Sequence, residues 1–300
     1  MAAGTVWLGM VGLRALLASG TLGRSLSQAL GSSVGPALIV TVVALLAAER
    51  RWPAVPGPLV TRAHLVDGAY LVLFALLVVP ALSCVQTGFA VEVGRHARFV
   101  LVGRLPLGPQ AVVVGIILLA TDALNWLVHL ANHRSGALWR LHALHHSQEE
   151  MSVLTTFRTH PLVHATYLPI LVPVLVLASS GTVPGAALAA YGCLVALPHA
   201  NLRWTFGPIG RVVVSPAYHR LHHARAFAGP QAVNLGFVLV CWDRLAGRSL
   251  QPATGEPVPT GIAGHPVPVE QDAAGARTVR TVLGQLTQPF VRRSGLEPSR

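Results

Sequence analysis

The sequence predicts an all-α, polytopic helical membrane protein. Three observations lead to this fold class. Hydrophobic residues make up 52% of the chain and charged residues only 11%, whereas a soluble domain carries about 25% charged residues. Long stretches contain no charge at all, and most of the 14 histidines fall into short clusters that follow such stretches. A surface so poor in charge suits lipid better than water.

The expected membrane helices are the uncharged runs of the first half of the chain. A helix needs about 20 apolar residues to cross the hydrocarbon core of a bilayer. Residues 25–48 and 68–91 meet this length, and residues 105–121 do so if the helix continues past Asp122 to about residue 130. Residues 5–19 are also apolar but contain Arg14, so we expect an interfacial or additional helix there.

A fourth uncharged run, residues 165–198, is too long for one crossing. As a single helix it would extend about 51 Å, against a bilayer core of about 30 Å. Residues 179–185 read Ser-Ser-Gly-Thr-Val-Pro-Gly, which is typical of a turn. We therefore expect a shallow hairpin that enters the membrane and returns on the same side.

The histidines form three motifs with helical spacing: one HxxxH and two HxxHH. On a helix, residues four apart lie about 40° apart around the axis, so each motif presents two or three imidazoles to one point in space. Imidazole is a ligand for iron, zinc, copper and nickel. Eight such side chains exceed the needs of one ion and suit two, which predicts a di-metal site on helix ends with the ligands His129, His133, His142, His145, His146, His219, His222 and His223.

Further site residues follow from their position relative to these motifs. His199 ends the expected hairpin and is favoured as a ninth ligand, whereas His160 is an open tenth position and His164 is disfavoured. Asp122 and Asn125 precede the first pair on the same helical face. A metal-bound histidine usually donates its other N–H to a carboxylate or carbonyl, so Asp122 is expected to orient a ligand or, as an equal alternative, merely to end the apolar span.

The charges are strongly unbalanced, with 22 basic residues against 11 acidic ones. A net charge of +11 suits an anionic membrane surface. Nucleic acid is not an expected partner, because the arginines are scattered and do not alternate with aromatic residues. The seven arginines between residues 134 and 225 are expected on the side of the histidines, and Arg95, Arg98 and Arg104 on the opposite side. The positive-inside rule then makes the histidine side cytoplasmic.

Three regions are expected along the chain. Residues 1–104 form an N-terminal transmembrane region, residues 105–250 a catalytic domain, and residues 251–300 a polar, partly disordered tail that is rich in Pro, Gly and Thr.

The run from Asp122 to Arg248 resembles the fatty acid hydroxylase and sterol desaturase superfamily. The resemblance rests on ordered motifs rather than on one short match. They are Asp122 with Trp126 and the first histidine pair, Leu138-Trp139-Arg140 before the second cluster, Phe157-Arg158-Thr159-His160-Pro161-Leu162, His199-Ala200-Asn201, Ser215-Pro216 before the third cluster, and Asn234-Leu235-Gly236 with Trp242-Asp243-Arg244-Leu245. This sequence departs from the family at Leu130, where an arginine is frequent, and at Val163, where an acidic residue is frequent.

The resemblance implies a centre of two iron ions held by these histidines, with O₂ as co-substrate and a lipid, such as a sterol or fatty acyl chain, that is hydroxylated or desaturated. No catalytic residue beyond the metal centre is expected. The sequence contains no nucleotide, flavin or haem motif, so an external electron donor, a reductase or a ferredoxin, is implied. The alternatives are a zinc-dependent membrane hydrolase, which normally needs a glutamate beside its ligands, and a non-enzymatic metal-binding membrane protein.

Overall fold

The computed structural model describes residues 34–58, 60–82, 84–85, 88, 110–170, 185–252, 257–264, 267–268 and 276–291. These residues form helices and no extended strand, which agrees with the predicted all-α fold class. Among them, the only β-type pairings are three isolated bridges. The longer helices are α3 (Val34–Arg51), α4 (Arg62–Leu73), α6 (Gln110–Arg134), α7 (Gly136–His146), α9 (Gly185–Ala196), α10 (Pro216–His222) and α12 (Ala276–Thr287). The remaining elements are the 3₁₀ and π helices η1 (Phe74–Val78), η3 (Val153–Phe157), η4 (Pro161–Ile170), η6 (Leu197–His199), η7 (Gly207–Arg211), η8 (Arg225–Phe227) and η9 (Gln288–Phe290), and the short α-helix α11 (Cys241–Leu245).

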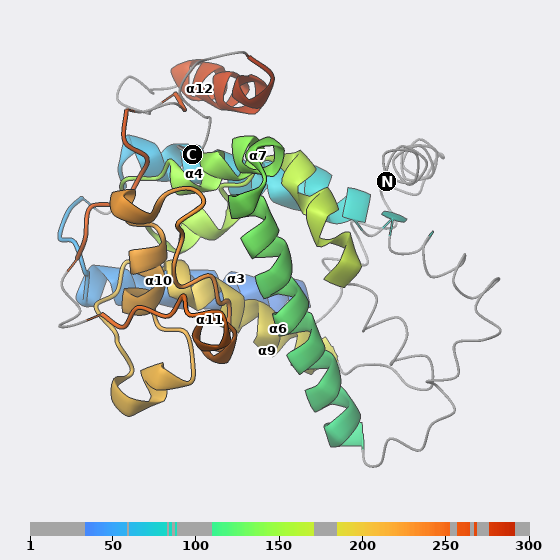
Figure 1. Ribbon diagram of the computed structural model, residues 1–300. Coiled ribbons are helices and arrows are strands. Elements are labelled where there is room, and N and C mark those ends of the chain that lie inside the picture. The colour runs from blue at the N-terminus through green and yellow to red at the C-terminus, as the bar shows by residue number, and fades with distance from the viewer. Residues whose placement is uncertain are drawn as a thin grey trace.

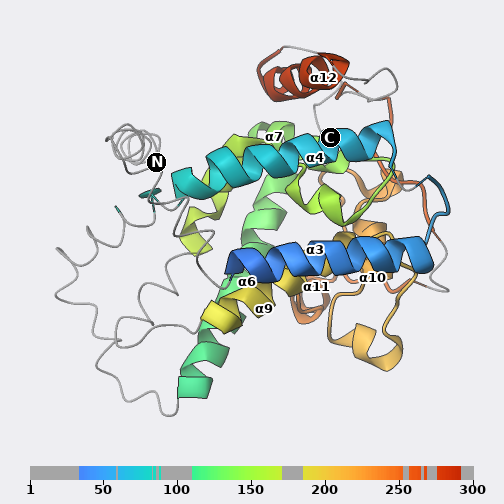
Figure 2. The ribbon, with the colours of Figure 1, turned by 180° about the vertical axis from the view of Figure 1, so that it is seen from behind.

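Helix α6 runs diagonally through the molecule and leads at its upper end into α7 (Figure 1). Helices α3 and α9 pack against each other, and α10 packs against η6 at the end of α9. Seen from behind, α3 and α4 lie one above the other, with α12 above α4 (Figure 2). The ends of α6, α7, η6 and α10 therefore meet in one region of the protein.

Two described helices, Arg62–Leu82 and Ala111–Arg134, are long and apolar enough to cross a membrane. They correspond to the expected runs 68–91 and 105–130. The first begins earlier than expected because Thr61 caps it: its hydroxyl accepts the backbone N–H of His64, and the His64 Nδ1 accepts the backbone N–H of Thr61. The multi-pass topology and the cytoplasmic side of the histidines stay predictions.

Large apolar side chains on these helices and on α3 face outward, where a lipid environment would cover them. They include Ile39, Val40, Val43, Leu76, Leu77, Val112, Ile116 and Leu119. The expected helix at residues 5–19 lies outside the described residues. So does the expected turn at residues 179–185, except for its last residue. Of the expected hairpin, η4 and α9 are described at either side of that gap.

The expected polar tail contains a helix that the sequence analysis did not foresee. Helix α12 packs on α4, where the Tyr70 hydroxyl donates to Gln285 at 3.1 Å. Val282 and Leu286 pack against the apolar cluster around Val66 and Trp139. The boundaries expected at residues 104 and 250 and the partial disorder of the tail stay predictions.

Candidate metal centre

Nine buried histidines converge from four helical elements. Some of these histidines lie in the last turns of α6 and in the C-terminal half of α7. Another is the last residue of η6, and the rest lie within α10 and at its C-cap. None of the nine is more than 5% exposed. They are the eight clustered histidines expected from the sequence together with His199, the ninth expected ligand.

The nine side chains divide into two groups. In each group, one ring nitrogen from every member lies within 4.8 Å of the corresponding nitrogen of every other member. The five-histidine group consists of His129, His133, His142, His146 and His222. The four-histidine group consists of His145, His199, His219 and His223.

Each HxxHH motif contributes to both groups, which corrects the expectation that it points at one place in space. In α7, His142 and His146 join the five-histidine group, whereas His145 joins the other. In α10 the pair four residues apart, His219 and His223, joins the four-histidine group, and His222 the other. Residues four apart share a helical face, and the histidine beside one of them is turned about 100° away. The motif therefore bridges two neighbouring sites.

The spacing of the ring nitrogens fits bound metal ions. Three pairs of Nε2 atoms lie 3.1 Å apart: His129 with His142, His145 with His199, and His199 with His219. Two imidazoles bound to one ion at about 2.1 Å and at a right angle would have their nitrogens about 3 Å apart. Both ring nitrogens of His146 and of His223 are buried without a hydrogen-bond partner among the described residues. Because buried polar atoms are normally satisfied, the donor set fits a pair of metals.

Burial also holds these histidines in the form that binds metals. Loss of hydration lowers the pKa of the α7 and α10 histidines well below 6.5, and lowers the pKa of His199 to about 3. Burial disfavours the charged imidazolium, and neighbouring histidines add to the effect. The rings are thus neutral near pH 7, as metal ligands must be.

A loop after α10 orients three members of the five-histidine group. The Nδ1 atoms of His129, His133 and His222 lie 2.8–2.9 Å from the backbone carbonyl oxygens of Leu235, Gly229 and Val233. An Nδ1–H that donates to a carbonyl leaves Nε2 free to bind a metal. We call residues 229–235 the carbonyl loop.

Two side chains hold the carbonyl loop in shape. Asn234 has a φ of 56°, in the left-handed region, and its side chain bonds the backbone of Tyr218 and Leu250. Asp243 accepts the backbone N–H of Leu235 and of Gly236, at 2.9 Å each. Asp243 also accepts from the Trp126 indole of α6 and from the Tyr218 hydroxyl of α10. In the sequence, Asn234 and Asp243 stand out only as parts of a family pattern, from which this role was not predicted.

Asp122 and Asn125 lie beside the site but orient no histidine directly. The Asp122 carboxylate accepts the backbone N–H groups of Val238 and Leu239 and the Trp242 indole N–H. Asn125 donates to the Tyr191 hydroxyl of α9, which in turn donates to Asp122. Backbone carbonyls take the place that was expected for Asp122. Its carboxylate instead fastens the segment that follows the carbonyl loop to α6.

His160 and His164 belong to neither group. The Nε2 of His160 lies 3.0 Å from the Leu286 carbonyl oxygen of α12, and its Nδ1 accepts the backbone N–H of Leu162. The Nε2 of His164 lies 2.9 Å from the Thr159 hydroxyl. In this structure His160 therefore connects the C-terminal helix to the start of η4, and both of its ring nitrogens are used.

A buried ion pair supports the end of α7. Arg158 and Asp67 lie 3.0 Å apart, and both side chains are fully buried. Arg158 also donates to the Leu144 carbonyl, and Asp67 also accepts from Gln148. A buried pair compensates its loss of hydration only when such extra hydrogen bonds are present. The pair anchors the helix that supplies ligands to both groups onto α4.

Comparison with known proteins gives a family and two relatives. Residues 114–248 match the model of the family described as fatty acid hydroxylase. An ornithine lipid hydroxylase from Rhizobium tropici is 29% identical over 63% of this chain and 54% of its own length. An alkylglycerol monooxygenase from Caenorhabditis elegans is 27% identical over 41% of this chain and 24% of its own length. The chain thus spans about half of one relative and a quarter of the other. No solved structure matches.

Proposed function

We propose that this chain, a member of the fatty acid hydroxylase superfamily, is a membrane-bound, O₂-dependent di-iron enzyme that hydroxylates a C–H bond of a lipid. The observation that carries the proposal is the division of nine buried histidines into two groups, each compact enough to surround one ion. The family match over residues 114–248, which include all nine, supports lipid oxidation as the chemistry.

In this proposal one iron is held by the five-histidine group and the other by the four-histidine group. Bound iron with O₂ supplies the oxidising power that an unactivated C–H bond requires and that no amino-acid side chain has. The choice of iron over zinc rests on the family. Asp122 and Asp243 bind backbone N–H groups, so they are not free to act as the general base of a zinc hydrolase.

The protein's own residues position the ligands and keep water out. The carbonyl loop fixes three rings, and the Arg158–Asp67 pair fixes α7. The nine histidines are nearly inaccessible, which protects a reactive centre from side reactions with solvent. Small residues in the described parts of the run 165–198, residues 165–170 and 185–198, are proposed to form the wall that faces the lipid, entered from the bilayer.

The names of the relatives narrow the substrate class. One is an ornithine lipid hydroxylase and the other an alkylglycerol monooxygenase. We propose that this chain likewise acts on a lipid with a polar head group and inserts one oxygen atom rather than removing two hydrogens. The electrons come from a separate reductase or ferredoxin, and the histidines lie on the cytoplasmic side of a multi-pass fold.

The test is a comparison of lipids from cells that express the wild-type chain or the His145→Ala/His146→Ala variant, which removes one ligand from each group. The expected result is a lipid heavier by one oxygen atom in wild-type cells alone, with the label appearing when ¹⁸O₂ is supplied. An unchanged lipid profile, or a product whose oxygen comes from water, contradicts the proposal.

A further inference from the structure

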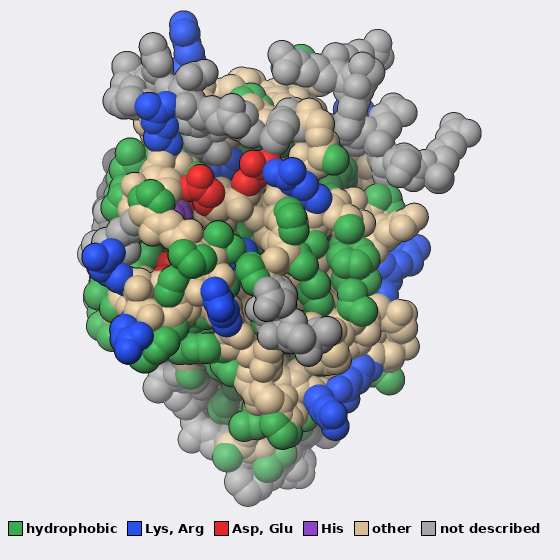
Figure 3. Space-filling model, turned by 90° about the vertical axis from the view of Figure 1, so that its left-hand side faces the viewer, with side chains coloured by type: hydrophobic (Ala, Val, Ile, Leu, Met, Phe, Trp, Pro, Cys, Tyr) green, Lys and Arg blue, Asp and Glu red, His purple; other side chains and the backbone are tan. Residues whose placement is uncertain are grey.

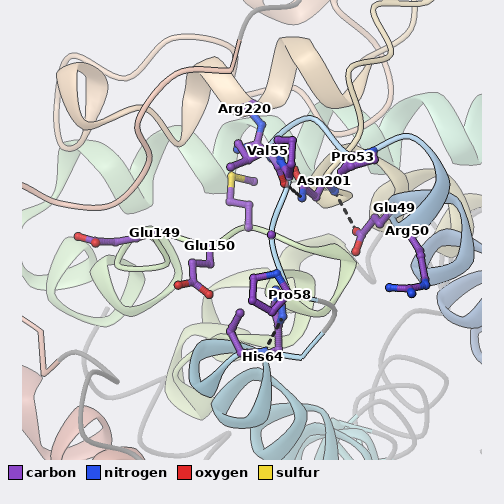
Figure 4. Close-up of a pocket in the computed structure, with 14 residues that line it drawn as sticks. Glu49, Arg50, Pro53, Val55, Pro58, His64, Glu149, Glu150, Asn201 and Arg220 are labelled. Carbon is purple, nitrogen blue, oxygen red and sulfur yellow. Dashed lines mark hydrogen bonds between the residues drawn. The ribbon is translucent and has the colours of Figure 1, made fainter.

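A cavity of about 260 Å³ with polar and apolar walls lies between the end of α3, the loop after it, and the segment after α7. The face of the molecule that includes the end of α3 carries acidic side chains near basic ones (Figure 3). Figure 4 shows Arg220 and Asn201 on one wall of the cavity, Glu149 and Glu150 on another, and Glu49 on the side opposite them. The cavity is thus lined by both signs of charge.

The walls of the cavity are continuous with the metal ligands in sequence. Arg220 directly follows His219, and Asn201 lies two residues after His199. Glu149 lies three residues after His146. A molecule bound in the cavity is therefore held by the same short segments that hold the two histidine groups.

Two arginines line the cavity, Arg50 and Arg220, of which Arg50 is exposed and Arg220 has unused hydrogen-bonding capacity. Arg220 is only 4% exposed. One guanidinium nitrogen, Nη2, donates to Asn201 at 2.9 Å, but Nε is buried without a partner among the described residues. Glu49, also in the cavity wall, uses one carboxylate oxygen to accept the backbone N–H groups of Val153 and Asn201. A guanidinium in the wall of a cavity is suited to bind a carboxylate or another anion.

Glu149 and Glu150 form the anionic wall. Glu150 is exposed and Glu149 is half-buried, with a 2.8 Å ion pair to Arg225. Two adjacent carboxylates with access to solvent are suited to bind an ammonium group. Val55, Pro56, Pro58 and Met151 line the same cavity and give it an apolar part.

We propose that this cavity binds the zwitterionic head group of an amino-acid lipid, with its carboxylate on Arg220 and its ammonium on Glu149 and Glu150. The volume is below the roughly 300–1,000 Å³ typical of sites for drug-sized ligands, so it accommodates a head group and not an acyl chain. The apolar residues contact the first carbons of the chain. The proposal rests on the proposed function for its choice of a lipid over a free amino acid.

The experiment measures binding by calorimetry with the full-length, metal-loaded chain in detergent. Three probes share an octanoyl chain: N-octanoyl-ornithine, N-octanoyl-norvaline, which lacks the ammonium, and N-(4-aminobutyl)octanamide, which lacks the carboxylate. Because a hydrogen bond to a charged group contributes about 1.5–3 kcal/mol, the ornithine probe is expected to bind at least about tenfold more tightly than either truncated probe. Free ornithine is expected to bind more weakly than its octanoyl derivative.

Variants assign the two charges. The Glu149→Gln/Glu150→Gln variant should lose about tenfold in affinity for the ornithine probe and nothing for the norvaline probe. Arg225→Gln breaks the same surface ion pair but keeps both carboxylates, so it is the matched control and should bind all probes as the wild type does. Arg220→Gln should weaken only probes with a carboxylate; its metal content shows whether the neighbouring ligands are intact.

Equal affinity for the three octanoyl probes, or a glutamate variant that binds like the wild type, overturns the proposal. Free ornithine that binds as tightly as its octanoyl derivative overturns the assignment to a lipid. Because binding is measured without turnover, the expected probe pattern in a chain that oxidises no lipid counts against the proposed function alone. Lipid hydroxylation without the probe pattern counts against the cavity alone.

Discussion

The five-histidine group and the four-histidine group differ in how their rings are held. Three members of the five-histidine group place Nδ1 within 2.9 Å of a carbonyl oxygen of the carbonyl loop. In the four-histidine group the Nδ1 atoms of His219 and His223 are buried without a partner among the described residues, and in the five-histidine group the same holds for His142 and His146. Outer partners raise the affinity of a ligand for its metal. The first group is thus the more rigid and the fuller site, and the second the more open one.

This difference predicts that the two proposed metals have different roles. A site with four histidines leaves more coordination positions for O₂ or substrate than a site with five, since octahedral ions accept six ligands. We therefore expect the four-histidine group to hold its metal less tightly and to be the more sensitive to ligand loss.

Removing one ligand from one or the other group, in separate variants, should have the largest effect on metal binding. His219→Ala leaves three histidines in its group and His129→Ala leaves four, so His219→Ala is expected to lose its metal more completely. The loss in metal affinity should exceed the about 10–100-fold that follows removal of an outer partner. Metal content after dialysis measures it. His164→Ala, which lies outside both groups, is the control. Equal metal loss from His219→Ala and His129→Ala would refute the asymmetry.

Acid should destabilise the metal-free chain by several kcal/mol. The pKa of each α7 and α10 histidine is lowered by burial in the folded state. Between pH 6.5 and the lower folded value, only the unfolded chain takes up protons, so stability falls as pH falls. Each histidine costs about 1 kcal/mol over the first pH unit below 6.5. Unfolding midpoints measured between pH 7.5 and 5.5 check this prediction. It is contradicted if the midpoint of the metal-free chain does not change with pH, or if bound metal does not stabilise the chain near pH 6.

Breaking the buried Arg158–Asp67 pair should affect both groups equally, because it supports α7. Arg158→Met leaves Asp67 as an uncompensated buried charge and is expected to cost about 3–5 kcal/mol in the free energy of unfolding. The double variant Asp67→Asn/Arg158→Met removes both charges and should recover part of the loss. Denaturant unfolding in detergent measures each cost. A single variant as stable as the wild type, or one that empties only one metal site, disagrees with this role.

Disturbing the carbonyl loop should weaken metal binding only in the five-histidine group. Asn234→Ala forces a side chain to stay in the left-handed region, at about 1–2 kcal/mol, and removes the bonds that hold the loop. The metal of the five-histidine group is expected to bind about 10–100-fold more weakly, with the other metal unchanged. Asn234→Gly tolerates the backbone angle but lacks the side chain, so it separates the two contributions. Equal weakening of both metals would show that the loop is not selective.

The histidine motifs made the nine candidate ligands predictable from sequence, because HxxxH and HxxHH have helical spacing and His199 follows an apolar run. The division into two groups was not predicted, since it depends on where the end of α7 faces the end of α10, and no local spacing encodes that. The roles of Asn234 and Asp243 were missed for a similar reason. Asp243 binds Trp126, more than a hundred residues earlier in the chain, and a contact of that range has no local signal.

The membrane helices show the same contrast between local and distant information. Apolar runs predicted the positions of Arg62–Leu82 and Ala111–Arg134, but the ends differ from the expected runs 68–91 and 105–130 by about four to nine residues. Helix α12 was overlooked because its region is polar on average. What stabilises it is a distant contact, in which Tyr70 of α4 donates a hydrogen bond to Gln285.

The nine histidines are proposed to hold two metal ions in unlike sites. Iron analysis with Mössbauer spectroscopy on the purified wild-type chain and on Asn234→Gly tests it most directly. We expect two irons per chain with two distinct signals, of which Asn234→Gly perturbs only one. A single metal ion per chain, zinc in place of iron, or two signals that shift together would contradict it.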